Sequence, residues 1–498
     1  MKPVVWTIAG TDPGGGAGIQ ADLKTFHGLG VHGGSIITAV IAQSSLGVRR
    51  VEFVAADLVT AQLEALLEER PPAAIKIGML GSAAAAHATA HFLGKQKDQA
   101  ARPHSVVVYD PVMGSSSGHE LMSGPLPEVI RTELLPLLDV CTPNIPEAER
   151  LTGLSIQNEE DLLQAARKLR ALGAKAVLLK GGHGPRQDFS QDLWLAGERP
   201  EWLTSPRRAA SHSHGTGCTL SSALAAFLAL GHSPLESAVL AKAYVNQGLR
   251  LGGPVGRGPG ILEHAGWPDH PEDVPWLTAS AEAGRSRGIF PAEGPDPIGL
   301  YPIVPRAAWL ERLLPLGVRV IQLRAKDLDG EALDCEVAAA VEISRRFNAH
   351  LYINDRGDLA RRHGAWGTHL GQEDLPGADL AALARAGLRV GISARSFEDI
   401  ARARAVRPSY IGLGAVYATG SKDIAYAPLG VEGFARLRRW LEVPAVAIGG
   451  ITLENAGPLL EAGADGLAVI SDLVNHPKPE QRVHEWQRAL AHRRPTRP

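Results

Sequence analysis

A series of eight short apolar segments, each followed by a helical or connecting stretch, fills the second half of this 498-residue chain. Short apolar runs that are bounded by turn residues and separated by helical stretches are typical of buried parallel strands. Eight such units in about 175 residues predict a closed (β/α)8 barrel, the TIM barrel. The expected strands are Leu300–Val304, Val320–Leu323, Leu351–Ile353, Thr368–Leu370, Arg389–Ile392, Tyr410–Leu413, Ala445–Ile448 and Gly466–Ile470.

The first half also alternates strands with helices. Its strands are continuous apolar runs, so we expect an α/β sandwich in which helices cover both faces of a mainly parallel central sheet. The clearest strands are Val4–Ala9, Ala74–Ile77, Ser105–Tyr109 and Ala176–Leu179. The clearest helices are Asp57–Glu69, Glu159–Leu172 and Thr219–Leu230.

Between the halves, over residues 252–297, Gly, Pro and acidic residues crowd together. This composition is typical of a linker, and the chain exceeds the roughly 250–300 residues at which a single core stops growing. We therefore expect a first domain over residues 1–270, a Gly- and Pro-rich linker over 271–297 and a second domain over 298–498.

Charge and composition narrow the classes of partner. The net charge is −2, and the sequence has no dense Lys/Arg run interleaved with aromatics, so we expect no nucleic-acid partner. No apolar run approaches the ~18–20 residues of a membrane span, and the first residues contain no signal-peptide core. Three scattered cysteines favour a reducing, cytoplasmic location. A homo-oligomer is compatible with the sequence, which does not set the oligomeric state.

Two glycine-rich segments carry the chemistry of the first half. The first, AGTDPGGGAG over residues 9–18, directly follows the opening strand. It does not fit the GxGxxG dinucleotide fingerprint, and the sequence contains no GxxxxGK(S/T) phosphate loop. The segment is either a flexible turn that lets a small ring approach the backbone or a plain strand-to-helix turn.

The second glycine-rich segment, HGTGCTLS over residues 214–221, opens an apolar helix. Gly215 and Gly217 leave backbone N–H groups free at the helix start, where the helix dipole also favours an anion. This arrangement suits a phosphoryl group in transfer, whose negative charge spreads over its oxygens. Cys218 lies in the first turn, where we expect the pKa of its thiol to fall; the alternative is a small packed side chain.

Further polar groups follow three strands, at the carboxyl ends where open α/β sheets bind ligands. Asp110 closes one strand, and Lys180 places a cation beside the phosphates. Asn144 and Glu147 lie three residues apart, within reach of one Mg²⁺ through water. These groups predict a nucleotide-dependent kinase in which Asp110, Asn144 and Glu147 serve ATP and Mg²⁺. The expected catalytic residues are Cys218, Lys180, Gly215 and Gly217.

Six segments follow one another across residues 4–250: AGTDPGGGAGIQADLKTF, IKIGMLGS, DPVM, TPNIPEAERLTG, LLKGGHG and HGTGC. In this order they resemble the hydroxymethylpyrimidine/phosphomethylpyrimidine kinase branch of the ribokinase-like superfamily. The resemblance implies ATP-dependent phosphorylation of 4-amino-5-hydroxymethyl-2-methylpyrimidine and then of its monophosphate. It also implies that Asp22 and Gln43 hydrogen-bond the pyrimidine and that Met79 lines its pocket. Cys218 would stand where sugar kinases carry an Asp base.

Two positions depart from this kinase pattern. Gly14 stands where Ser is usual, and Ser44–Ser45 replace a usual Asn-Thr, so the fine specificity for the pyrimidine stays open. The alternative is a pyridoxal-type kinase of the same superfamily, against which the cysteine of HGTGC argues.

In the expected barrel, functional groups lie at the C-terminal ends of strands, and these ends are unusually polar. They carry Gln322–Lys326, Asn354–Arg356, Gly371–Asp374, Ser393, Thr419–Lys422, Gly449–Gly450 and Ser471. Isolated salt bridges do not explain polar clusters at seven consecutive strand ends. Arg324, Lys326 and Lys422 form a cationic group, and the last two loops fit a phosphate site. Asp355 and Asp374 offer the hard oxygens that Mg²⁺ prefers.

Seven segments, QLRAK, YINDR, HLGQEDLP, GISAR, YIGLGAVYATGSKD, AIGGI and GADGLAVIS, cover about residues 299–473 and resemble thiamin phosphate synthase. The resemblance implies condensation of the pyrimidine diphosphate with 4-methyl-5-(2-phosphoethyl)thiazole, through a cation at the exocyclic CH₂, to give thiamin phosphate and pyrophosphate. The implied pyrimidine diphosphate site is Gln322, Leu323, Arg324, Ala325, Lys326, Asn354, Ser393 and Lys422. The implied thiazole phosphate site is Thr419, Gly420, Ser421, Gly450, Ile470 and Ser471. The implied Mg²⁺ ligands are Asp355 and Asp374.

The second half also departs from its family at two places. Ala325 replaces a usual acidic residue, and Gly420–Ser421 vary a usual Thr-containing turn, which leaves the grip on the thiazole phosphate open. A thiazole tautomerase shares this barrel but lacks parts of the metal and diphosphate set, and a non-catalytic module that binds thiazole phosphate is a second alternative.

Overall fold

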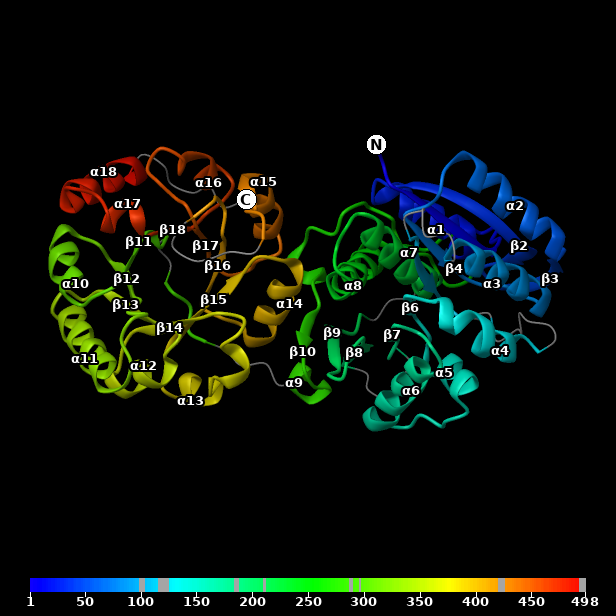
Figure 1. The fold of residues 1–498 in the computed structure, drawn as a ribbon, viewed down its shortest axis with the longest axis horizontal. Coiled ribbons are helices and arrows are strands. Elements are labelled where there is room, and N and C mark those ends of the chain that lie inside the picture. The colour runs from blue at the N-terminus through cyan, green and yellow to red at the C-terminus, as the bar shows by residue number, and fades with distance from the viewer. Residues whose placement is uncertain are drawn as a thin grey trace. The chain divides into compact units, whose positions relative to one another are not determined.

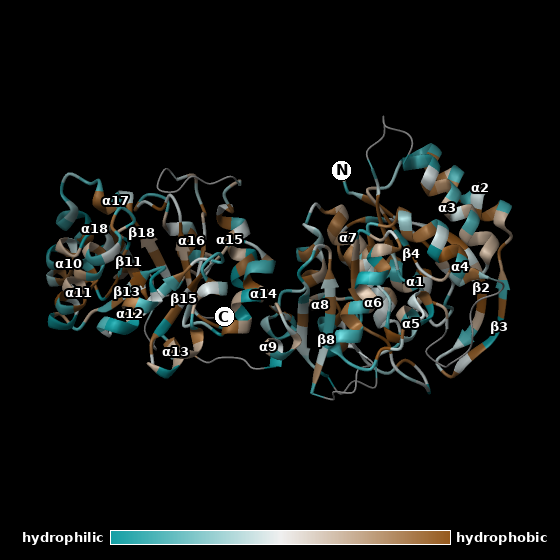
Figure 2. Cartoon of the chain, turned by 60° about the horizontal axis from the view of Figure 1, so that its bottom comes forward, coloured by the Kyte–Doolittle hydropathy of each residue, from teal (hydrophilic) through white to brown (hydrophobic). Residues whose placement is uncertain are grey.

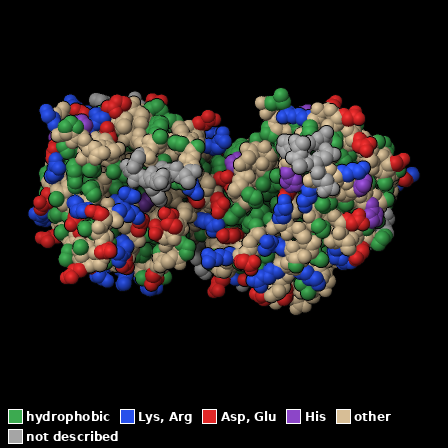
Figure 3. All heavy atoms as spheres, in the orientation of Figure 1, with side chains coloured by type: hydrophobic (Ala, Val, Ile, Leu, Met, Phe, Trp, Pro, Cys, Tyr) green, Lys and Arg blue, Asp and Glu red, His purple; other side chains and the backbone are tan. Residues whose placement is uncertain are grey.

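The computed structural model of the chain divides into two compact units, Met1–Arg285 and Ser286–Pro498, each with its own sheet (Figure 1). It describes residues 1–97, 104–114, 125–182, 188–208, 212–285, 290–294, 297–419 and 426–491. Among these residues no helix is long and apolar enough to cross a membrane. Lys/Arg and Asp/Glu side chains are interspersed over the visible face of each unit (Figure 3).

The first unit, which we call the N-terminal unit, is built on a sheet of ten described strands in the order β10-β9-β8-β7-β6-β5-β4-β1-β2-β3. The strands from β2 through β1 to β7 are parallel, and β3, β8, β9 and β10 add antiparallel pairs at the edges. Their bounds are β1 Val4–Gly10, β2 His32–Ser44, β3 Gly47–Phe53, β4 Ala74–Ile77, β5 Val106–Tyr109, β6 Val140–Cys141, β7 Ala176–Leu179, β8 Phe189–Leu195, β9 Glu201–Pro206 and β10 Trp276–Thr278.

Helices cover both faces of this sheet. α7 contacts both α1 and α8 on one side, while α2, α3, α5 and α6 share a buried apolar cluster with the strands on the other. α7 is apolar almost all round and is buried from Thr219 to Phe227, as expected for a helix packed between a sheet and other helices. The bounds are α1 Gly18–Gly28, α2 Ala56–Glu69, α3 Ala83–Lys97, α4 Leu126–Val129, α5 Ile145–Thr152, α6 Glu159–Ala171, α7 Thr216–Ala229, α8 Pro234–Leu251 and α9 Ala281–Arg285.

The second unit, the barrel unit, is a closed barrel in which eight parallel strands follow one another in chain order. The strands are β11 Gly299–Val304, β12 Val320–Leu323, β13 His350–Asn354, β14 Gly367–Leu370, β15 Arg389–Ala394, β16 Tyr410–Gly414, β17 Ala445–Ile448 and β18 Gly466–Val469. The helices are α10 Ala308–Leu313, α11 Gly330–Arg346, α12 Gly357–His363, α13 Leu380–Arg385, α14 Phe397–Val406, α15 Gly430–Arg438, α16 Gly457–Glu461, α17 Ser471–Val474 and α18 Pro479–Ala491.

Hydropathy follows this architecture (Figure 2). Outer helices such as α2, α12 and α18 alternate hydrophilic and hydrophobic residues, because each buries one face only. The barrel interior is different, since three of its buried core residues are the tyrosines Tyr301, Tyr352 and Tyr410. The barrel is therefore filled by large rings whose hydroxyl groups need hydrogen-bond partners.

The segment expected to be a linker is largely folded in the structure. Residues 271–285 belong to the N-terminal unit, where Asp273 is fully buried and pairs with Arg250 at 2.6 Å. In the barrel unit Glu293 is buried and accepts hydrogen bonds from His350, at 2.8 Å, and from the Tyr352 hydroxyl. The acidic residues Asp273 and Glu293 thus form buried polar contacts within the two units. Composition alone had suggested a solvated linker, because it does not show which acidic residues find buried partners.

Candidate active sites

The carboxyl ends of the parallel strands of the N-terminal unit converge on one edge of the sheet. Gly10 ends β1, Asp110 directly follows β5, and Lys180 directly follows β7. The strand order also reverses here, because β1 lies between β4 and β2 and the crossovers from β1 and β4 lead to opposite sides. Such a reversal opens the crevice in which open α/β sheets bind their ligands.

The two glycine-rich segments meet at this edge, 202 residues apart in sequence. The Asp12 carboxylate accepts hydrogen bonds from the backbone N–H groups of Gly14, Gly16 and Ala17 at 2.8–3.0 Å, and it lies 3.2 Å from His214 Nε2. Burial raises the pKa of Asp12, but the hydrogen bonds from His214, Gln43 and the backbone outweigh it and lower the pKa to about 2. Asp12 is therefore a charged connector between the two segments.

Glycine is required at the start of α7. Gly215 has φ +85°, and a Cβ there would overlap the carbonyl oxygen of Gly16. A Cβ at Gly217 would stand 3.2 Å from Lys180 Nζ and 3.5 Å from Asp110 Oδ2. The helix start thus lies directly against the charged groups at the ends of β5 and β7, as the sequence predicted.

Those charged groups form a buried cluster. Lys180 Nζ lies 2.5 Å from Asp110 Oδ1 and 3.8 Å from Glu147 Oε2. Burial raises the pKa of Glu147 to about 7, although Lys180 opposes the shift, and Asp110 adds to it. The Asn144 side chain accepts from Glu147 N at 2.9 Å, and Glu147 accepts from Asn144 N at 2.7 Å, a capping box at the start of α5. The cap already uses the two groups that the sequence assigned to Mg²⁺.

Cys218 lies in the first turn of α7, as predicted, but the expected shift in its pKa is wrong. Burial raises the pKa of the thiol to about 11; Lys76 lowers it, while Asp22 and Asp110 raise it further. The helix start does not overcome desolvation here. Cys218 is therefore a neutral thiol at pH 7.

The predicted pyrimidine residues occupy different environments. Asp22 is fully buried, and its carboxylate accepts from Thr7 at 2.5 Å, from Lys76 at 2.8 Å and from Ser222 at 2.6 Å. Both of its oxygens are thus used inside the protein. Its partner Lys76 is also fully buried, and nothing in its strand pattern distinguished it from an ordinary core position.

Gln43 and Met79 lie nearer the edge of the crevice. Met79 packs with Ala39 and Ile41, and a Cβ at Gly10 would meet its methyl group at 2.7 Å. Gln43 lies at a register shift in the pairing of β2 with β3 and is partly exposed. Together they form an apolar wall with one amide beside the first glycine-rich segment.

In the barrel unit, charged residues gather at the ends of β12, β13 and β14. Lys326 Nζ forms an ion pair with Asp355. Burial raises the pKa of Asp374, a backbone hydrogen bond from Gly371 lowers it, and the charge of Asp355 raises it further. The two carboxylates are therefore close enough to repel each other, as a divalent cation site requires. Asp355 also has φ +59°, a strained conformation for a non-glycine residue.

The remaining residues of the predicted diphosphate site divide between surface and interior. Arg324 and Asn354 are partly exposed, and their side chains form no ion pair or hydrogen bond with another described residue. Leu323 and Ala325 are buried. Gln322 is 2% exposed and its amide faces Tyr301, so it lies in the barrel interior. Ser393 is partly exposed, and its hydroxyl lies 2.8 Å from His369 Nε2.

The loops predicted to seat the thiazole phosphate also lie together. Gly450 has φ +65°, and a Cβ there would overlap the carbonyl oxygen of Ala418, so the loops after β16 and β17 are in contact. Ile470 and Ser471 follow β18 and begin α17. Thr419 is the last described residue before a gap, and the predicted residues Gly420, Ser421 and Lys422 lie outside the described residues.

Sequence reasoning missed three residues that support these sites. In the N-terminal unit, His214 contacts Asp12. In the barrel unit, burial lowers the pKa of the interior His369 to about 4, so that its side chain is neutral at pH 7. Arg482 of α18 binds Glu454, from the loop after β17, at 2.7 Å and Asp472, after β18, at 2.8 Å. Only His214 carried a signal, because it immediately precedes the second glycine-rich segment.

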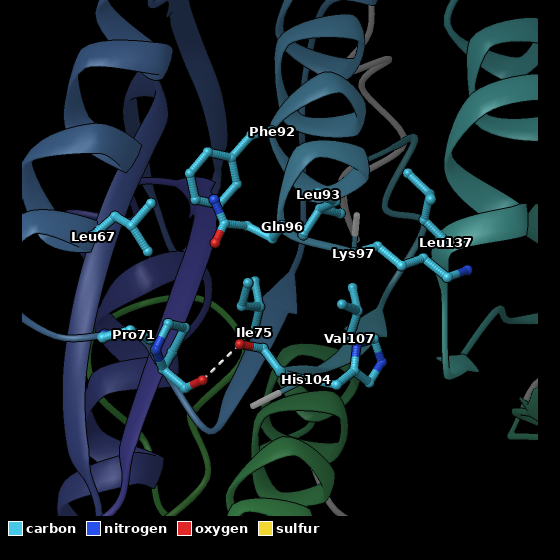
Figure 4. Close-up of a pocket in the computed structure, with 12 residues that line it drawn as sticks. Leu67, Pro71, Ile75, Phe92, Leu93, Gln96, Lys97, His104, Val107 and Leu137 are labelled. Carbon is cyan, nitrogen blue, oxygen red and sulfur yellow. Dashed lines mark hydrogen bonds between the residues drawn. The ribbon is translucent and has the colours of Figure 1, made fainter. Parts of the chain in front are cut away.

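A small apolar pocket of about 30 Å³ lies at the opposite end of the sheet from the crevice (Figure 4). Its wall includes Ile75 of β4 and Val107 of β5, near the amino ends of these strands, and Phe92 of α3. Ser105 donates a hydrogen bond to Pro72 across its floor at 2.6 Å. A space of this size admits only about two water molecules, so it is too small for a substrate.

Comparison with known proteins identifies a family for each of the two units. A model of the phosphomethylpyrimidine kinase family matches residues 12–263, and a model of the thiamine monophosphate synthase family matches residues 300–473. The thiamine biosynthetic bifunctional enzyme TH1, chloroplastic, of Arabidopsis thaliana is 34% identical, over 95% of this chain and 90% of its own length. The thiamine biosynthesis bifunctional protein ThiED of Geobacter sulfurreducens is 44% identical over 52% of each chain.

Among solved structures, the pyridoxal kinase from Staphylococcus aureus in complex with AMP-PCP covers 56% of this chain and 98% of its own, with 33% identity and a TM-score of 0.50. This likeness confirms the ribokinase-like sandwich of the N-terminal unit, and the closed eight-stranded barrel confirms the predicted TIM barrel. The chain belongs to the bifunctional enzymes of thiamine biosynthesis, in which a phosphomethylpyrimidine kinase is fused to a thiamine monophosphate synthase.

Proposed function

We propose that the N-terminal unit phosphorylates 4-amino-5-hydroxymethyl-2-methylpyrimidine twice with ATP and that the barrel unit joins the diphosphate to 4-methyl-5-(2-phosphoethyl)thiazole. The observation that carries this proposal is the charge at the two sites. The first places a cation and a glycine-rich helix start together, and the second places two repelling carboxylates beside the cation of Lys326. Each suits the handling of phosphate groups.

In the kinase reaction, the N–H groups at the start of α7 receive the charge that develops on the transferred phosphoryl group, and Lys180 adds a cation beside it. Cys218 is a neutral side chain at this helix start, so it contributes shape and a weak hydrogen bond. Gln43 and Met79 line the pyrimidine pocket, and Asp22 supports it from within through Lys76. Asp110 and Glu147 are the carboxylates that would hold a Mg²⁺ carried by ATP, whose charge would offset that of the phosphates.

In the synthase reaction, the bond between the exocyclic CH₂ and the diphosphate breaks, and both electrons leave with pyrophosphate. The thiazole nitrogen then donates its lone pair to the CH₂ and completes the new C–N bond. Arg324, Lys326 and Asn354 hold the diphosphate, together with Lys422 from outside the described residues. Asp355 and Asp374 would hold Mg²⁺, whose charge would stabilise the leaving group. Thr419, Gly450, Ile470 and Ser471 seat the thiazole phosphate.

The direct test uses the full chain with the hydroxymethylpyrimidine, ATP, Mg²⁺ and the thiazole phosphate, and it measures thiamin phosphate and pyrophosphate. Arg324→Met should stop the release of pyrophosphate but leave both phosphorylations intact. Release of pyrophosphate also separates a synthase from a thiazole tautomerase or a non-catalytic binding module. Thiazole phosphate that binds without turnover would contradict the synthase assignment.

Pyridoxal is a second candidate substrate of the kinase site, because the solved kinase from Staphylococcus aureus that resembles this unit is a pyridoxal kinase. Competition between pyridoxal and the hydroxymethylpyrimidine for phosphorylation decides between them, and we expect the pyrimidine to have the higher kcat/KM. The expected cytoplasmic location is tested by fractionation of the source cells, and association of copies by light scattering.

A further inference from the structure

A continuous chain of hydrogen bonds crosses the interior of the barrel from β12 to β15. Gln322 Nε2 donates to the Tyr301 hydroxyl at 3.1 Å, and the hydroxyls of Tyr301 and Tyr410 lie 2.8 Å apart. The Tyr410 hydroxyl lies 2.8 Å from His369 Nδ1, and His369 Nε2 lies 2.8 Å from Ser393 Oγ. We call these five residues the interior relay.

The barrel makes room for the relay. A Cβ at Gly391 of β15 would overlap the Tyr410 ring, and a Cβ at Gly412 of β16 would stand 3.2 Å from His369 Cε1. Two neighbouring strands therefore lack side chains where the rings lie. Gln322, Tyr301, Tyr410 and His369 are at most 8% exposed, whereas Ser393 is partly exposed. The relay thus reaches the surface of the site at Ser393.

The chemistry at its buried end sets the direction of the relay. An amide nitrogen donates and does not accept, so Tyr301 accepts from Gln322 and passes its own hydrogen to Tyr410. Tyr410 then donates to His369 Nδ1, which leaves the ring hydrogen on Nε2, facing Ser393. Ser393 accepts this hydrogen, and its own hydroxyl hydrogen is free to point into the site.

We propose that His369 is a positioning residue for the synthase: it holds Ser393 as a hydrogen-bond donor toward a ring nitrogen of the pyrimidine. The inference rests on the proposed function, in which the barrel unit binds the pyrimidine diphosphate, and on the expectation that Ser393 belongs to that binding site. The aminopyrimidine presents both ring-nitrogen acceptors and an amino donor, and a freely rotating hydroxyl could pair with either. With its direction set by the relay, Ser393 selects the ring edge that carries an acceptor.

Two substitutions of His369 separate this role from simple packing. His369→Gln can place an amide N–H near the former Nε2 position and still donate to Ser393, whereas the shorter His369→Asn reaches Tyr410 but not Ser393. We expect His369→Asn to raise the KM for the pyrimidine diphosphate about fivefold, the worth of one neutral hydrogen bond. His369→Gln should stay within about twofold of the parent chain. The KM for thiazole phosphate should be unchanged in both.

An altered substrate completes the test. Replacing one ring nitrogen of the pyrimidine diphosphate by CH should raise the KM of the parent chain about fivefold for one of the two isomers. The same replacement should not raise the KM of His369→Asn any further, because this variant has already lost the hydrogen bond from Ser393 to the ring nitrogen. Equal effects of the Asn and Gln variants, or losses that add fully with the altered substrate, overturn the proposal.

Failure of the relay can be told from failure of the proposed function. If the parent chain releases no pyrophosphate, the proposed synthase function is contradicted. If the parent chain is active and the variants have the same KM values as the parent, only the proposed role of the interior relay is contradicted. If the His369 variants do not fold, Tyr410→Phe keeps the ring and removes the hydroxyl. It should raise the KM for the pyrimidine diphosphate about threefold and leave that for thiazole phosphate unchanged. An unchanged KM for both substrates overturns the proposal in this variant as well.

Discussion

The two sites hold their charges differently. In the N-terminal unit Lys180 is almost enclosed, with 14% of its side chain exposed, and it is paired with carboxylates that are more buried still. In the barrel unit the Lys326 side chain is 57% exposed, and Arg324 has no ion-pair partner among the described residues. The first site is thus balanced internally, while the second keeps cationic groups at its surface.

The difference follows from the cost of burying charge. An enclosed cation needs a partner at all times, because removing one member of a buried pair leaves the other uncompensated. Charges at the open ends of barrel strands are solvated, so they can stay without a protein partner until a diphosphate and its metal bind. Substitutions in the N-terminal unit should therefore affect folding and activity together, and equivalent changes in the barrel should affect activity alone.

The largest expected effect concerns where the units can be separated. Fragments 1–285 and 290–498 should fold alone and keep their own reactions, whereas 1–270 and 296–498 should be insoluble or inactive. The shorter fragments lose Asp273, the buried partner of Arg250, and Glu293, the buried acceptor for Tyr352. Solubility, thermal unfolding and the two activities measure this directly. Asp273→Asn and Glu293→Gln in the full chain are the matched controls, and a stable 1–270 would show that β10 is dispensable.

The next effect tests the comparison of the two lysines. Lys180→Met should lower phosphorylation about 100-fold or more and destabilise the N-terminal unit by about 3 kcal/mol, because Asp110 and Glu147 lose their cation. Lys326→Met should change the free energy of unfolding by less than about 0.5 kcal/mol while weakening the synthase. Denaturant unfolding and both assays are run on each variant. Equal destabilisation by the two changes would contradict the proposed difference between the enclosed Lys180 and the solvated Lys326.

The carboxylate pair of the barrel gives an effect of intermediate size. Asp355→Asn should raise the Mg²⁺ concentration needed for half-maximal synthase activity about tenfold or more, because an amide does not offset the charge of the metal. Asp374→Asn should act in the same way. If both hold one ion, the double change costs less than the product of the single changes. Fully multiplicative losses, with an unaltered Mg²⁺ dependence, would rule out a shared metal.

Cys218→Ala should lower both phosphorylations about tenfold and leave the synthase unchanged, because the thiol packs at the phosphate-binding helix start. Since burial raises the pKa of the thiol to about 11, alkylation by iodoacetamide should be slow at pH 7 and accelerate continuously through pH 10. Cys218→Ser should lose less than Cys218→Ala. Rapid alkylation at pH 7 that levels off below pH 8 would identify a thiolate instead.

The smallest expected effect is the change in the free energy of unfolding of each unit with pH. Burial lowers the pKa of His264 and of His369 to about 4, so each contributes stability above pH ~6.5 that is lost as the pH falls toward 4. Each should cost its unit about 1 kcal/mol between pH 7 and 5.5. Glu147, whose pKa is raised, takes up its proton in the folded unit first and adds stability over the same range. The barrel unit should therefore lose more stability than the N-terminal unit, and Glu147→Gln should remove the difference.

The sequence predicted most of the parallel strands, because their apolar runs are local signals, but it did not predict β2 and β6. Ala74–Ile77, Val320–Leu323 and Ala445–Ile448 have the expected bounds to the residue. The antiparallel strands β3, β8, β9 and β10 were not predicted, since they mix polar residues such as Arg50 and Asp192 with the apolar ones. In addition, β10 pairs with β9, which is distant from it in sequence.

For the two sites, the sequence predicted where the site residues lie in the fold, but it did not predict how buried they are or which residues they pair with. Asp110, Lys180 and Gly217 lie together as their place at strand and helix ends implied. The buried state of Asp22 and Gln322 depends on Lys76 and Tyr301, which come from other strands. No local pattern identifies such pairs, and the assignment of both residues to the substrate, which the resemblance implied, stays a prediction.

The contact between Asp12 and His214 also sets the order in which the N-terminal unit can be completed during synthesis. These residues lie 202 positions apart, and Asp22 and Ser222 lie 200 apart, so closing the site requires nearly the whole unit to have left the ribosome. The strands β1, β2 and β4 are available much earlier. A nascent chain that ends before residue 214 therefore has the edge of the sheet but not its phosphate-binding helix start, and kinase activity begins only after α7 emerges.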